Sequence, residues 1–82
     1  MLTKEKMEEA LSKAEKVREE AAVFLKENRP NYYTSEEVAE AVSSDKDIVM
    51  DALIRLSVKP FGHVQLIQLA EKSGVVYYYT YR

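Results

Sequence analysis

The sequence predicts a small α+β fold that is mostly helical, with three helices followed by a two-stranded β-hairpin. A long charged stretch near the N-terminus repeats its apolar residues at helical spacing and contains neither glycine nor proline. A capping-box pattern opens a second helical segment in the middle of the chain. The final stretch is a run of β-branched and aromatic residues, which is typical of a strand. With 82 residues, the chain has room for one domain, which we take as residues 1–82.

The first predicted helix covers about residues 3–28 and ends before Pro30, because a residue that precedes proline avoids the α region. Its length of about 39 Å exceeds that of a domain of this size. Its first turns therefore have little of the same chain to pack on, which predicts a homodimer through this N-terminal helix. The alternative is an overhanging, partly frayed helix. The predicted interface residues on this helix are Met7, Leu11 and Ala14.

Two shorter helices are predicted between residues 34 and 57. The first starts at Thr34, whose side chain can cap the Glu37 amide while the Glu37 side chain reaches back. Two serines at 43–44 interrupt the helical pattern, because their side chains compete for backbone hydrogen bonds. The third helix is predicted from about Asp45 to Ser57. Its core-facing positions are Val49, Leu53 and Leu56. Residues 31–33, just before the second helix, can lie extended, with a short strand as one possible form.

The last third of the chain predicts a β-hairpin over about residues 64–81, with strands at 64–70 and 75–81 and a turn of four residues, 71–74. Residues 65–72 also contain good helix formers, with Gly74 placed like a helix cap. We favour the strand because the second strand needs a partner. Alternation places Tyr77, Tyr79 and Tyr81 on one face of that strand. These tyrosines are expected either to pair across the hairpin and cover the core, or to form an aromatic surface for a partner or for bases.

The order of these elements resembles the winged helix-turn-helix family. Residues 34–42 and 45–56 are similar to its helix-turn-helix, with Ala39 as the small residue that follows an apolar one and Val49 as the apolar residue midway along the second helix. The resemblance implies a winged helix, with a three-helix core, a hairpin wing and here an extended N-terminal helix. It also implies a transcription-regulator-like protein that binds double-stranded DNA through its third helix and wing. The candidate DNA-binding residues are Lys46, Arg55, Lys59 and Lys72.

The distribution of charge favours a second function. The net charge is −2, but residues 30–59 carry three basic and six acidic side chains, a net of −3. The third helix contributes carboxylates, which repel a polyanion, at several positions that would face DNA. The alternative function is therefore a winged-helix protein–protein interaction module that does not bind DNA. Its surface would include three apolar residues on the outer side of the third helix, unless the first helix or a sheet edge covers them. These residues are Ile48, Met50 and Ile54.

Several function classes have no support in the sequence. There is no cysteine and only one histidine, His63, so no zinc site is expected. Two glycines cannot form a phosphate-binding loop, and no catalytic constellation is present. We therefore expect no enzyme activity, no cofactor and no metal. The charged start of the chain lacks the pattern of a secretory signal, and the longest uncharged run is too short to cross a membrane. A cytoplasmic protein without membrane contact is expected.

Overall fold

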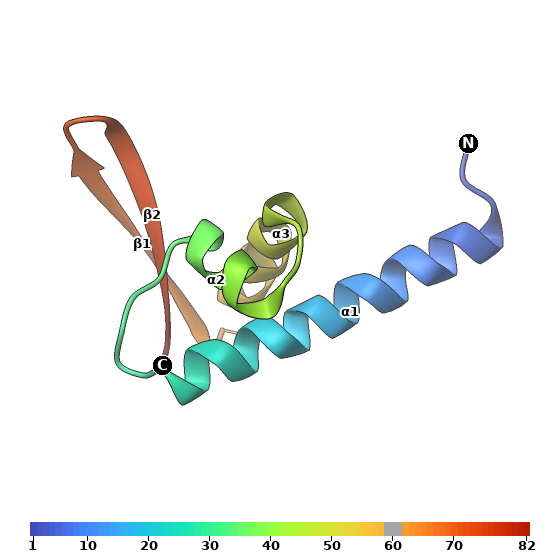
Figure 1. Ribbon diagram of the computed structural model, residues 1–82, viewed down its shortest axis with the longest axis horizontal. Helices are drawn as coiled ribbons and strands as arrows, with labels where there is room; N and C mark the ends of the chain where they lie inside the picture. Colours follow the sequence, from blue (N-terminus) through green and yellow to red (C-terminus); the bar gives the residue numbers. More distant parts are fainter. Residues whose placement is uncertain (59–61) are drawn as a thin grey trace.

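The computed structural model describes residues 1–58 and 62–82, and it has three helices and one antiparallel hairpin in that order (Figure 1). This confirms the predicted α+β class, the mostly helical content and the order of the elements. It also decides between strand and helix for residues 65–72, because residues 65–71 lie in the first strand and Lys72 begins the turn. The elements are α1 (Lys4–Glu27), α2 (Ser35–Val42), α3 (Lys46–Ser57), β1 (Val64–Glu71) and β2 (Gly74–Tyr81).

Local capping sets the helix ends to within a residue of their predicted positions. The Thr3 side chain accepts a hydrogen bond from the Lys6 amide at 3.2 Å and so starts α1. Asn28 ends α1, with its backbone N–H donating to a carbonyl of the last turn. Ser43 ends α2 in the left-handed conformation, with φ of 55°. Asp45, predicted as the first residue of the third helix, is its N-cap instead. The two caps are separated by a single residue, so the chain turns tightly between α2 and α3.

The core lies where the second half of α1 meets α2, α3 and the base of the hairpin (Figure 1). The three predicted inward positions of α3 are all buried, which confirms the spacing argument. The second half of α1 contributes one buried residue per turn, because its apolar positions recur every four residues. The buried apolar residues are Val17, Ala21, Leu25, Val38, Ala39, Val49, Ala52, Leu53, Leu56, Val64 and Tyr79.

The first half of α1 projects beyond the other elements (Figure 1). None of residues 1–13 is buried, and the buried positions of the helix begin at Val17. The side chains of Met7 and Leu11 are 43% and 58% exposed. The structure thus shows the overhang that the helix length predicted, while the homodimer through this helix stays a prediction.

The hairpin is more regular than predicted. β1 and β2 pair from Val64 with Tyr81 as far as Glu71 with Gly74, so the turn has two residues, Lys72 and Ser73, and the prediction of a four-residue turn was wrong. The reason is that Gly74 adopts φ of +124°, which L side chains rarely adopt, and can therefore begin β2 directly after the turn. The two strands are eight residues long and extend past the helices as a two-stranded ribbon (Figure 1).

The segment before α2 adds a short bridge to the hairpin, which confirms the predicted extended piece. Tyr33 donates its backbone N–H to the Tyr79 carbonyl at 2.9 Å, and the Tyr79 N–H donates to the Tyr33 carbonyl at 2.7 Å. The Thr80 hydroxyl donates to the Asn31 carbonyl at 2.9 Å, close to the same bridge. The Phe24 and Tyr33 rings pack edge to face with centroids 4.9 Å apart. These contacts attach the base of the hairpin to the end of α1 and so position β2 beside α2.

Candidate functional site

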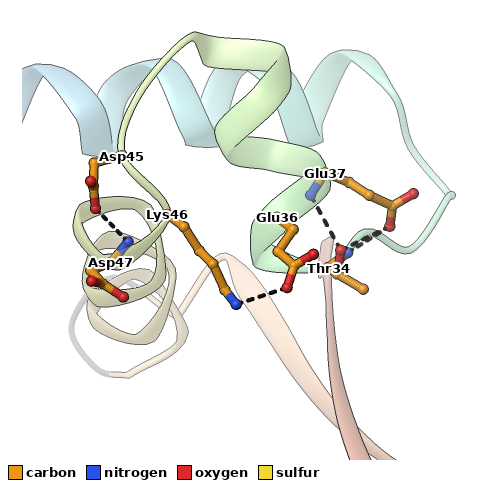
Figure 2. Close-up of polar contacts among 6 residues, drawn as sticks. All are labelled: Thr34, Glu36, Glu37, Asp45, Lys46 and Asp47. Atoms are coloured by element: carbon orange, nitrogen blue, oxygen red, sulfur yellow. Dashed lines mark hydrogen bonds and ion pairs between the residues drawn. The ribbon is translucent and has the colours of Figure 1, made fainter.

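Two of the cations predicted to bind DNA are paired with carboxylates on the helical surface. The Lys46 Nζ, in the first turn of α3, lies 2.7 Å from Glu36 Oε1 in α2 (Figure 2). The Arg55 Nε lies 2.9 Å from Asp51 Oδ2, one turn earlier in α3. A phosphate that approached either cation would therefore have to compete with a carboxylate already in place.

The other two candidates do not join these cations in one described cluster. Lys72 lies in the turn between β1 and β2, which projects away from the helices (Figure 1). Lys59 lies outside the described residues. The described candidates are therefore spread over three places: the start of α3, its last turn and the tip of the hairpin.

The ion pair between Lys46 and Glu36 also shifts the titration of both groups. The Lys46 ammonium donates a hydrogen bond to the Glu36 carboxylate and attracts it electrostatically, which lowers the pKa of Glu36. The same hydrogen bond and charge raise the pKa of Lys46. Both side chains are exposed, so the pair contributes little to stability. The pair matters more for the surface charge, because it leaves no net positive charge where the first turn of α3 faces solvent.

Carboxylates at the starts of α2 and α3 have structural roles that keep this surface acidic. The Glu37 amide donates to Thr34 Oγ1 at 3.2 Å, and the Thr34 amide donates to Glu37 Oε1 at 2.9 Å, which confirms the predicted capping box (Figure 2). The Asp45 carboxylate accepts from the Asp47 amide at 2.8 Å (Figure 2). Residues 34–57 carry six acidic and two basic side chains, a net charge of −4.

A groove opens between this acidic surface and the hairpin. Its volume is about 360 Å³. One side is polar and carries the ion pair between Glu36 and Lys46, while Met50 and β2 provide apolar side chains. We call it the α3–β2 groove, and it is lined by Thr34, Ser35, Glu36, Lys46, Met50, Val75, Val76, Tyr77 and Tyr79. The sequence indicates Lys46, Met50 and the tyrosines of β2 as surface candidates, but nothing in it shows which part of β2 stands opposite α3, so Val75 and Val76 come from the structure alone.

The three apolar residues predicted on the outer side of α3 divide into two groups. Met50 and Ile54 are 39% and 45% exposed. Ile48 is half-buried against the core and, with Ala10 and Ala14 of α1, lines a second hollow of about 360 Å³ between α1 and α3. Positions two residues apart in an α-helix are rotated by about 200° around its axis, so Ile48 and Met50 cannot lie on the same face of α3. Only Met50 and Ile54 are therefore available as an outer apolar patch on α3.

The tyrosines of β2 divide between the core and the exposed surface. Tyr79 is 2% exposed and belongs to the core, and burial raises the pKa of its phenol. Tyr77, on the same face, is 47% exposed and lines the groove. The Tyr81 ring stacks on His63 at 5.9 Å between centroids, and the Arg29 guanidinium lies 5.7 Å from the same ring. The sequence analysis missed this last cluster, which joins the end of α1 to the base of the hairpin.

No protein-family model, curated protein or solved structure matches this chain. Within residues 1–58 and 62–82, no three His, Cys, Asp or Glu side chains gather where they could hold a metal ion. No helix in that part of the chain combines the length and apolar character needed to cross a bilayer. The functional interpretation therefore depends on the charge, exposure and geometry of the surfaces described above.

Proposed function

We propose that this chain is a non-enzymatic winged-helix module that binds a protein partner through the α3–β2 groove. The observation that carries the proposal is the exposed pair Met50 and Tyr77 in this groove, beside a helical surface, residues 34–57, that has a net charge of −4. Exposed apolar side chains inside a polar rim are typical of a protein-binding surface. The winged-helix assignment is supported by the tight turn between α2 and α3 and by the hairpin beside them.

The charge beside the groove favours a basic partner. Glu36 and Lys46 neutralise each other, so the unbalanced charge comes from the other acidic residues of α2 and α3. An amphipathic segment whose apolar face is flanked by Lys or Arg would match this surface. Its apolar side chains would cover Met50 and Tyr77, and its cations would face the carboxylates. We therefore propose a basic amphipathic helix as the bound segment.

A model peptide of leucine and lysine at helical spacing can test this proposal directly. Binding to the full chain would be followed by fluorescence anisotropy at about 50 mM and about 500 mM salt, since exposed charge pairs are screened over this range. Met50→Asp should weaken binding at least about 10-fold, because it places a charge in the apolar contact. The matched control is Met7→Asp, on the overhang of α1, where the methionine has a similar exposure of 43%. Equal affinities for the wild type and the Met50→Asp variant would show that the peptide does not bind in the α3–β2 groove.

DNA binding is the second candidate, and one observation favours it. The hairpin projects from the helices with Lys72 in its turn, as a wing that contacts a phosphate backbone would. A homodimer would present two such turns and double the number of cations. A duplex titration at about 50 mM salt tests this, because phosphate contacts give a steep decrease in affinity with salt. Duplex binding that is lost in the Lys72→Glu variant would favour DNA over a protein partner.

A further inference from the structure

The outer edge of β1 carries backbone groups that point away from β2. The backbone N–H and C=O of Tyr79 both form hydrogen bonds with Tyr33, so neither group points toward Leu66, the residue of β1 that lies opposite Tyr79. In an antiparallel ladder this makes Leu66 and Tyr79 a non-hydrogen-bonded pair, and the N–H and C=O of Leu66 point to the opposite edge. The pattern alternates along the strand, so the backbone groups of Gln68 and Ala70 point the same way.

Residues 64–70 lack the side chains that usually protect an edge strand against pairing. Residues 64–70 contain no charge, proline or glycine, whereas natural edge strands commonly carry such residues. Leu66 and Leu69 are 41% and 49% exposed, and they lie on opposite faces of the sheet. The outer half of the hairpin extends beyond the helices, and a two-stranded ribbon is only marginally stable alone (Figure 1). The edge is therefore suited to receive a further strand.

We propose that a second copy of this chain pairs its β1 antiparallel with β1, so that the two hairpins form one four-stranded sheet. The two-fold axis would pass beside Gln68, which pairs with the partner's Gln68. A register centred closer to the helices is disfavoured because Val64 is fully buried and its edge is covered. This inference goes beyond the proposed function, and β1 does not line the α3–β2 groove.

The second copy fits this edge because the pairing is self-complementary. In the register centred on Gln68, Ile67 faces the partner's Leu69 on one side of the sheet, and Leu66 faces the partner's Ala70 on the other. The one charged residue of β1, Glu71, accepts a hydrogen bond from the Tyr78 hydroxyl at 3.0 Å and faces the partner's Gln65, which can donate a second one. No like charges of β1 stand opposite each other. The chain thus supplies an occupant with apolar residues on both faces and a matching donor for its only carboxylate.

The absence of native cysteine allows a specific cross-linking test. Gln68→Cys would place two Cα atoms about 5.5 Å apart across the two-fold axis, within the range of a disulfide. In the control Gln65→Cys, the equivalent atoms would be about 20 Å apart. Under mild oxidation, we expect a covalent dimer from Gln68→Cys and none from Gln65→Cys. A covalent dimer from Leu11→Cys and none from Gln68→Cys would place the second copy on α1 and overturn the inference.

A charge-reversal pair tests the same contact without a disulfide. Gln68→Glu and Gln68→Lys are exposed substitutions, and each would oppose like charges across the axis, which should weaken self-association about 5-fold in sedimentation equilibrium. An equimolar mixture of the two variants should recover or exceed the wild-type association. Met50→Asp should leave self-association unchanged, which separates this test from that of the groove. A wild-type chain that stays monomeric at millimolar concentration would overturn the inference. An extended segment of another protein would then be the candidate to pair with this edge.

Discussion

A pair of leucine substitutions in α1 tests the division of this helix into a packed half and an overhang. Leu25 has no exposed surface and lies in the core, whereas Leu11 is 58% exposed on the projecting half. Truncating a fully buried leucine to alanine costs about 2–5 kcal/mol, because the transfer free energy is lost and a cavity remains. A chain of this length has a total stability of about 4–12 kcal/mol. Leu25→Ala therefore removes a large part of the free energy of unfolding.

Urea denaturation followed by circular dichroism would measure both variants against the wild type. We expect Leu25→Ala to lower the free energy of unfolding by about 3 kcal/mol, with an unchanged dependence on urea. Leu11→Ala, the matched control, should change it by less than about 0.5 kcal/mol at low protein concentration. If Leu11→Ala destabilised the protein as much as Leu25→Ala, and more so at high protein concentration, Leu11 would be buried by a second chain. That result would refute the description of the first half of α1 as a free overhang and would support the homodimer predicted from its length.

Two further predictions concern capping and titration. Thr34→Ala removes the hydroxyl that accepts from the Glu37 amide and should lower the free energy of unfolding by about 1 kcal/mol in urea denaturation. Thr3→Ala, at the start of the overhang, should lower it less, because residues 1–13 are exposed in the part of the chain that the structure describes. Equal costs at the two caps would contradict this account of α1. Burial raises the pKa of Tyr79 above 10.0, so the stability that comes from its neutral form is complete below that pH and is lost as the pH rises through the folded-state pKa. The pKa of Tyr78 is also raised, chiefly because its hydroxyl donates a hydrogen bond to Glu71. In an absorbance titration of the Tyr78→Phe variant, the phenol that ionises above the usual range should therefore disappear when Tyr79→Phe is added and persist when Tyr77→Phe is added instead. Loss of that step with Tyr77→Phe would show the assignment to be wrong.

The features that the sequence predicted well depend on residues close together in the chain. The capping box needs only Thr34 and Glu37, and the strand β2 follows from its run of β-branched and aromatic residues. The groove depends on how α3 and β2 meet in space, and no local pattern determines that. The ion pair between Lys46 and Glu36 joins residues ten positions apart on different helices. Alternation placed Tyr77 and Tyr79 on one face, but only the folded chain shows that one is buried and the other is exposed.

The same local requirements that build α2 and α3 also weaken the case for base recognition by α3. A helix N-terminus attracts anions, and a DNA phosphate would be favoured at the start of α3. That position is already occupied by the Asp45 carboxylate, which accepts from the Asp47 amide, and the nearest cation is engaged by Glu36. Removing the caps to admit a phosphate would cost the helices about 1 kcal/mol each. A cationic partner avoids this conflict, because it can approach the carboxylates while they continue to cap the helices. Helix capping and recognition of a basic segment are therefore compatible on this surface, whereas helix capping and phosphate binding at α3 compete for the same amides.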